Sequence, residues 1–125
     1  MMNFKLCAFA DEADKQMSGQ VAAMLRNGLN GLEIRGVDGE NVSKISLEKA
    51  KEVRKLLDDN GLSVWSIGSP IGKIRMDKDF GEHLEVYRHT LEVAQILGAQ
   101  KLRMFSFFMG EDDPAIHKNA VIDRI

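Results

Sequence analysis

Hydrophobic residues form four short runs along the chain, and each run is followed by a longer segment with apolar residues at helical spacing. Each short run reads as a strand that ends in polar, acidic or glycine-containing residues. The predicted strands cover residues 4–9, 31–35, 62–73 (whose second half is a loop) and 101–108. Four strands that alternate with four helices predict an α/β fold with a parallel sheet and helical crossovers.

Polar residues mark the boundaries of the predicted helices. Asp11 and Glu12 follow the first strand, and we expect them to cap the first helix, because a helix N-terminus favours negative charge. The expected N-caps of the later helices are Ser46, Asp79 (with Glu82 completing a capping box) and Asp113, which precedes Pro114.

Charged residues share one face of the second predicted strand. Leu32 and Ile34 alternate there with Glu33 and Arg35. A helix packed over two charges removes them from water at a large cost, so Leu32 and Ile34 are expected beneath the helices. Glu33 and Arg35 then point to the opposite side of the sheet.

The fourth strand repeats this pattern, with Leu102 and Met104 expected on the helix face and Arg103 and Phe105 opposite. Charges on one consistent face favour a barrel with a polar mouth over a doubly wound sheet, which is apolar on both faces. Alternate strands of a barrel fill the same interior layers, so Arg103 and Glu33 are expected to form an ion pair. The pair is either neutralised interior structure or a ligand contact.

The third strand leads directly into a loop. Pro70 has no N–H and ends the strand ladder, and Lys73 places a cation at the carboxyl end, where ligands bind in parallel α/β folds. The simpler interpretations are a solvated loop residue for Lys73 and a turn residue for Ser69. Strict alternation places Ser63, Trp65, Ile67 and Ser69 on one face and Leu62, Val64, Ser66 and Gly68 on the other.

Motifs for catalysis are absent from the sequence. It has no GxGxxG, P-loop, HExxH or CxxC pattern, and it gives no metal cluster or nucleophile. The histidines at positions 83, 89 and 117 fall in predicted helices and are interpreted as surface or capping residues. The aromatic residues interpreted as core are Trp65, Phe105, Phe107 and Phe108.

The composition fits one globular domain. The chain has 125 residues, of which 44% are hydrophobic and 29% are charged. A formal net charge of −2 gives no electrostatic footprint for nucleic acid. The one cysteine, Cys7, indicates a reducing compartment, and no apolar run is long enough for a signal peptide or a membrane span. We therefore expect a cytoplasmic protein without nucleic-acid or membrane partners.

Four strand-end motifs resemble those of one family. They are FADE at residues 9–12, GLEIR at 31–35, SIGSPIGK at 66–73 and LRMFSFF at 102–108. In this order and spacing they resemble the xylose-isomerase-like TIM barrels, especially the sugar phosphate isomerase/epimerase branch. The likeness covers essentially the whole chain but only the first four βα units of an eight-stranded barrel. It implies a single parallel (β/α)4 half-barrel domain, residues 1–125, that stops within its fourth helix.

The resemblance also implies a function. Members of the branch are metal-dependent isomerases and epimerases of carbohydrates, which hold a divalent ion (Mn, Mg or Zn) with Glu, Asp, His and Glu on the later strands. Those strands are missing here, so the likeness implies substrate contacts but no cofactor or metal ligand in this chain, and no activity of the chain alone. The substrate is a small-molecule sugar. The implied substrate-binding residues are Glu33, Arg35, Ser69, Lys73, Arg103 and Ser106.

A half-barrel leaves the inner face of its sheet bare and both edge strands unpaired. Either a missing second half or self-association completes it, and the bare face predicts a homodimer or a larger homo-oligomer. The alternative function is a non-catalytic half-barrel that binds itself or a partner. A relationship to the apurinic endonucleases is less favoured, because residues 66–73 and 102–108 lack the zinc-binding histidines of that branch and the net charge is negative.

Overall fold

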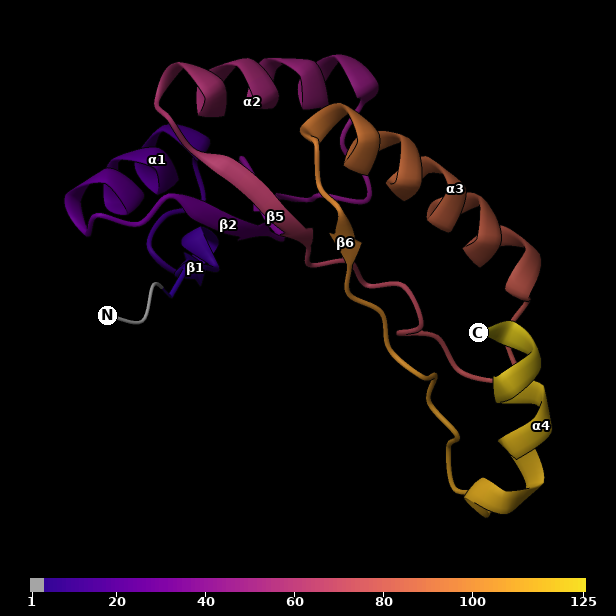
Figure 1. Cartoon of the computed structure of the whole chain (residues 1–125). Coiled ribbons are helices and arrows are strands. Elements are labelled where there is room, and N and C mark those ends of the chain that lie inside the picture. The colour runs from indigo at the N-terminus through magenta and orange to yellow at the C-terminus, as the bar shows by residue number, and fades with distance from the viewer. Residues whose placement is uncertain (1–3) are drawn as a thin grey trace.

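The computed structural model describes residues 4–125, which contain a four-stranded parallel sheet in the order β1-β2-β5-β6 (Figure 1). Three helices lie along one face of this sheet, and a fourth helix lies beyond its end. The α/β class and the parallel sheet are therefore confirmed. The sheet strands are β1 (Cys7–Ala8), β2 (Gly31–Ile34), β5 (Ser63–Ile67) and β6 (Lys101–Leu102). The helices are α1 (Met17–Arg26), α2 (Leu47–Asp59), α3 (Phe80–Leu97) and α4 (Pro114–Arg124).

Two small elements connect the first strands to their helices. A 3-10 turn, η1 (Ala10–Glu12), follows β1. After β2 the chain forms an antiparallel hairpin of β3 (Gly36–Val37) and β4 (Glu40–Asn41), where the sequence predicts only a loop. Both elements lie at the carboxyl ends of parallel strands, and they shape that edge of the sheet.

The hydrophobic core lies between the sheet and the helices. Leu32 and Ile34 are fully buried there, as the alternation in β2 predicts. Burial of side chains of this size stabilises the fold by about 1.5–3 kcal/mol each. Other core members are Met24, Val53, Leu57, Val64, Ile67, Val93 and Leu97.

The later helices begin as the sequence predicts. The Ser46 side chain accepts a hydrogen bond from the Lys49 N–H at 3.0 Å, and Asp113 accepts from the Ala115 N–H at 2.9 Å. Asp79 also caps α3, but it accepts from the Gly81 N–H rather than forming the reciprocal capping box. Each cap satisfies a backbone donor that the helix itself leaves unpaired.

The first helix is capped from a distance. The Met17 N–H donates to Asp38 Oδ1 at 2.7 Å, and Lys49 lies 2.5 Å from the other oxygen of that carboxylate. Hydrogen bonds from Lys49 and Met17 hold the pKa of Asp38 below its usual value. The prediction that Asp11 and Glu12 cap this helix is wrong, because both carboxylates accept hydrogen bonds from Arg35, directly after β2, instead.

A β-bulge in β5 changes which side chains share a face. Between Leu32 and Glu33 the β2–β5 register advances by two residues on β5, so Trp65 has no partner on β2. The extra residue reverses the alternation, and Val64 and Ile67 are both buried against the helices. The prediction that Ile67 shares a face with Trp65 is therefore wrong.

The first strand is shorter and more exposed than predicted. β2 begins at Gly31, which pairs with Cys7, so the residues before Cys7 have no strand beside them. Phe4 and Leu6 are 73% and 61% exposed, and Cys7 is also exposed. The prediction of a buried strand over residues 4–9 is therefore wrong for residues 4–7.

The fourth strand is regular only over Lys101 and Leu102. β5 ends at Ile67, so the residues after β6 bond first to that last residue of β5 and then to the loop that follows it. This irregular pairing leaves Phe108 and Met104 exposed by 55% and 40%, against their predicted places in the core and under the helices. The backbone bonds run from Arg103 N–H to Ile67 O, Phe105 N–H to Ile71 O and Phe107 N–H to Gly72 O.

Helices long and apolar enough to cross a membrane are not found within residues 4–125.

Candidate functional site

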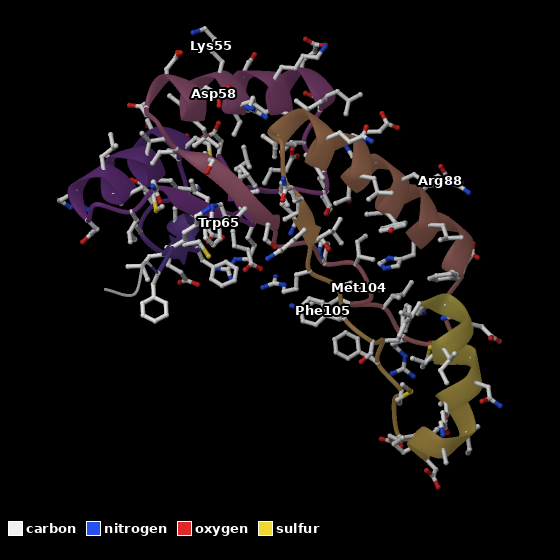
Figure 2. The ribbon with its side chains drawn as sticks, in the orientation of Figure 1. Lys55, Asp58, Trp65, Arg88, Met104 and Phe105 are labelled. Atoms are coloured by element: carbon white, nitrogen blue, oxygen red, sulfur yellow. The ribbon has the colours of Figure 1, made fainter. Side chains whose placement is uncertain are left out.

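A row of cations and aromatic rings crosses the carboxyl ends of the parallel strands. Phe105, one of its rings, lies on the side of the sheet away from the helices (Figure 2). Phe9 lies between two guanidinium groups, with Arg35 4.9 Å and Arg103 5.4 Å from its ring centroid. Phe105 continues the row between Arg103 at 5.2 Å and Lys73 at 4.7 Å. We call these five residues the cation–aromatic row. Each contact of this kind contributes roughly 0.5–1 kcal/mol at a partly exposed site.

Two carboxylates hold the first cation in place. The Arg35 guanidinium donates to Asp11 at 2.8 and 3.1 Å and to Glu12 at 2.5 Å. These hydrogen bonds, first to Asp11 and then to Glu12, raise the pKa of Arg35 above its usual value. The 3-10 turn after β1 brings both carboxylates over the end of β2. Arg35 is therefore fixed and charged at one end of the row.

The central cation is paired with Glu33. Arg103 Nη1 lies 3.3 Å from Glu33 Oε1, so the expected ion pair is confirmed. The alignment falls short of a hydrogen bond, and both Glu33 Oε1 and Arg103 Nε are buried without a hydrogen-bond partner among the described residues. Buried polar atoms normally find a partner, so the pair retains hydrogen-bonding capacity. Both atoms lie at the middle of the row, covered by the surrounding chain.

Lys73 is the cation at the other end of the row, and its surroundings differ from those of Arg35 and Arg103. Its side chain is exposed, and its ammonium lies over Phe105. Within residues 4–125 no carboxylate lies at ion-pair distance from it. The loop is fixed below it, since the Lys73 N–H donates to Pro70 O at 2.8 Å. A flexible cation on a fixed loop suits contact with an anionic or polar ligand.

The two predicted serines do not join the row. Ser69 is fully buried, and its hydroxyl donates to Arg103 O at 2.5 Å and accepts from the Ile71 N–H at 3.2 Å. It therefore ties the loop after β5 to the segment after β6. Ser106 is exposed beyond Phe105, with no hydrogen bond from its side chain in the part of the chain described.

Sequence reasoning missed the aromatic half of the row. Phe105 was interpreted as core, although its parity with Arg103 places it on the charged face. Phe9 was treated only as the end of a strand, and Asp11 only as a cap. The available signal was the FADE segment, where a ring and two carboxylates follow one another directly at a strand end.

A second polar feature lies behind the loop that carries Lys73. The Gly72 N–H donates to His83 Nε2 at 2.8 Å, so this nitrogen carries no proton. Burial lowers the pKa of His83. The imidazole is therefore neutral and structural, and it is not one of the surface or capping residues that the sequence predicts.

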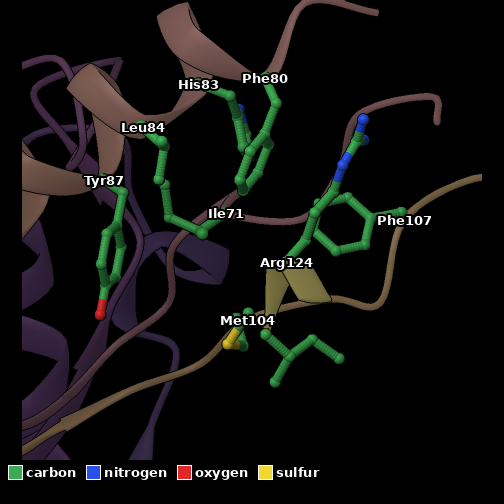
Figure 3. Close-up of a pocket in the computed structure, with 9 residues that line it drawn as sticks. Ile71, Phe80, His83, Leu84, Tyr87, Met104, Phe107 and Arg124 are labelled. Atoms are coloured by element: carbon green, nitrogen blue, oxygen red, sulfur yellow. The ribbon is translucent and has the colours of Figure 1, made fainter. Parts of the chain in front are cut away.

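His83 borders a small cavity of about 70 Å³ between α3, α4 and the segment after β6 (Figure 3). Phe107 has a left-handed backbone with φ of 75°, and its ring meets Phe80 edge-on at 5.8 Å. The Arg124 guanidinium lies over both rings, 4.8 Å from Phe80 and 5.6 Å from Phe107. The contacts around this cavity thus hold α4 against α3. It is lined by Ile71, Phe80, His83, Leu84, Tyr87, Met104, Phe107, Arg124 and Ile125.

The carboxylates that pair with the arginines of the row do not fit a divalent ion. Asp11, Glu12 and Glu33 each face a guanidinium group, which competes for the same oxygens. Over residues 4–125 no three His, Cys, Asp or Glu side chains come together as a metal-binding group.

Neither a scan of protein-family models nor a search of curated proteins gives a match to this chain. The interpretation of the site therefore depends on its own residues. They offer three cationic side chains and the faces of two aromatic rings, all at the carboxyl ends of the strands of a parallel sheet. Such an arrangement can bind and orient an oxygen-rich ligand.

Proposed function

We propose that the chain is the amino-terminal half of a metal-dependent isomerase or epimerase of sugars or sugar phosphates. In this proposal the cation–aromatic row contacts the substrate. The row is the observation that carries the proposal, because it lies at the carboxyl ends of parallel strands, where α/β enzymes bind their ligands. The resemblance of the four strand-end motifs supports the same assignment.

The chemistry of the row suits a carbohydrate. Guanidinium and ammonium groups only donate hydrogen bonds, so they match the hydroxyl, carbonyl and phosphate oxygens of a sugar. Aromatic rings offer an apolar surface for the C–H face of the ligand. Arg35 and Arg103 are fixed by carboxylates, so they lose little freedom when a ligand binds.

The role assigned to this chain is binding and orientation. Interconversion of a ketose and an aldose needs a base that removes a proton next to a carbonyl, and a divalent ion stabilises the resulting enediolate. The carboxylates beside the row, Asp11, Glu12 and Glu33, are engaged with arginines and are assigned neither task. A four-stranded parallel sheet with helices on one face is compatible with half of a barrel, whose other half would supply both.

The test is a titration of the ¹⁵N-labelled chain with D-ribulose 5-phosphate and, separately, with D-ribulose. We expect amide shift changes at Phe9, Arg35, Lys73 and Arg103, larger for the phosphate ester. Shift changes confined to other surfaces, or none at millimolar ligand, would contradict the proposal.

An activity assay tests the division of roles. The pure chain is expected not to interconvert ribulose 5-phosphate with its isomers, with or without added Mn²⁺. Turnover that a chelator abolishes would show that the chain holds a complete catalytic site.

A further inference from the structure

The open face of the sheet continues into two strand edges that lack a neighbour among the described residues. β1 and β6 are the outer strands of the sheet, and their outer edges carry unpaired backbone groups. Natural sheets cover, charge or pair such edges. Beside β1, Phe4 and Leu6 are 73% and 61% exposed. A surface of this kind marks an interface.

The two edges carry opposite charges at the same end of the sheet. β1 leads into Asp11 and Glu12, and the Glu12 side chain is 74% exposed although it contacts Arg35. On the β6 side, Lys73 lies over Phe105 with no carboxylate at ion-pair distance within residues 4–125. The acidic edge and the cationic edge are therefore complementary. Both charges lie at the carboxyl ends of parallel strands, so edge-to-edge pairing brings them to one level.

We propose that the chain on its own pairs with a second copy, which covers the open face in place of the barrel half that the proposed function assigns to other strands. A twofold axis places β1 of each copy alongside β6 of its partner, in parallel. The Glu12 carboxylate of each copy then faces the partner's Lys73, and the same contact forms at both seams. Eight strands close in this way around an interior that side chains can fill.

Two features favour a second copy over an unrelated partner. The two edges match each other in strand direction and are opposite in charge. A twofold axis therefore pairs both edges of each copy by repeating one β1–β6 contact. The Trp65 ring, on the open face but outside the cation–aromatic row, also fills space between two facing sheets. The cation–aromatic rows of the two copies then form one ring, so each copy contributes to a shared mouth. The dimer itself does not require the proposed substrate.

The first test is the mass of the chain in solution. Sedimentation velocity at low micromolar concentration is expected to give a single species of twice 14.0 kDa. A well-folded monomer would overturn the proposal, and so would a broad distribution of aggregates without a defined dimer.

Charge reversal tests the seam directly. Lys73→Glu and Glu12→Lys are each expected to weaken the dimer at least tenfold, because each creates like-charge contacts at both seams. The double variant restores opposite charges and is expected to dimerise within a few-fold of the parent. Lys44→Glu, a reversal at an exposed position before α2, is the matched control and should leave the dimer unchanged.

Circular dichroism of each variant shows whether it is folded, so that lost dimer is not confused with lost structure. Folded single variants that dimerise like the parent would overturn the proposed seam. A double variant no better than the single ones would do the same. Neither result bears on sugar binding, which the amide titration tests separately.

Discussion

Gly72 is the residue at which three separate segments meet. Its N–H donates to His83 on α3, and its carbonyl accepts from the Phe107 N–H. Its φ of +83° is in the left-handed region, where only glycine is unstrained. A methyl group at this position would collide with the carbonyl of Phe105. The loop that presents Lys73 therefore depends on the missing side chain.

Gly72→Ala is expected to destabilise the fold by roughly 3 kcal/mol or more, from backbone strain and the collision with the Phe105 backbone. Gly39→Ala is the matched control, since Gly39 has a φ of +85° but open space around its α-carbon. It should cost about 1 kcal/mol from strain alone. Urea denaturation measures both values, and equal losses would contradict the assigned collision.

Lys73→Ala is expected to weaken binding of D-ribulose 5-phosphate about tenfold while leaving the melting temperature unchanged. The lysine is exposed, so its removal opens no cavity, but it takes a cation from the row. Calorimetric titration and a thermal melt measure the two effects, with Lys44→Ala as the control for general charge. A lower melting temperature with unchanged affinity would argue against a binding role.

The loop between β5 and α3 is held by an imidazole rather than by strand pairing. His83 accepts the Gly72 N–H only while it is neutral, because protonation turns Nε2 into a donor. Ionisable groups that line the two hollows beside His83 come from α3, from α4 and from the segment before α3. These groups are Lys78, Asp79, Glu82, Tyr87 and Arg124.

The stability of the chain is expected to fall as the pH drops below about 6.5, the ordinary value for histidine. Burial lowers the pKa of His83 in the folded state, so over this range the unfolded chain binds more protons than the folded chain. Stability therefore rises with pH across the window between the two pKa values.

Urea midpoints between pH 7.5 and 5.5 measure this effect. His83→Gln keeps an acceptor for the Gly72 N–H but cannot titrate, so its midpoint should change less over this range. His117→Gln removes an imidazole outside the loop contact and is the matched control. An identical slope for the parent and His83→Gln would contradict the role of His83.

Local rules explain which elements the sequence could predict. Caps at Ser46, Asp79 and Asp113 need only neighbouring residues, and all three form. The cap of α1 comes from Asp38, 21 residues away, and no local pattern reveals it. The bulge at Trp65 is equally invisible, because it depends on the register with β2.

In the candidate site, the positions of the charged residues could be predicted from the sequence, but those of the aromatic residues could not. Alternation along β2 and the segment after β6 places Glu33, Arg35 and Arg103 on one side, and Glu33 and Arg103 meet. The position of Phe9 between two arginines requires the turn after β1, which only the folded chain shows. Ser69 was predicted to contact substrate, and its complete burial follows from the irregular pairing beyond β5.

At the scale of the whole molecule, the chain is an arch with its helices outside (Figure 1). Trp65 and Phe105 lie on the inner side of this arch (Figure 2). On this inner face Trp65 packs over Gly31 and beneath Lys5. It is the one tryptophan of the sequence, so its fluorescence reports on this face alone.

Acrylamide quenching of Trp65 is expected to weaken as the protein concentration rises from nanomolar to micromolar, because a second copy shields the ring. The folded Lys73→Glu variant, with a weaker seam, should show the same change at higher concentration. Quenching that is independent of concentration, in a chain that sediments as a dimer, would place the interface on another surface.

The bulge in β5 also determines which single residue this strand can lose without losing its buried side chains. Losing one residue from a regular strand turns every later side chain to the wrong face. In β5 the loss of Trp65 instead restores simple alternation, with Val64 and Ile67 still directed into the core. A deletion there should leave the sheet intact, whereas deletion of Val64 should unfold it. β5 can therefore gain or lose this one codon during evolution without a rearrangement of the core.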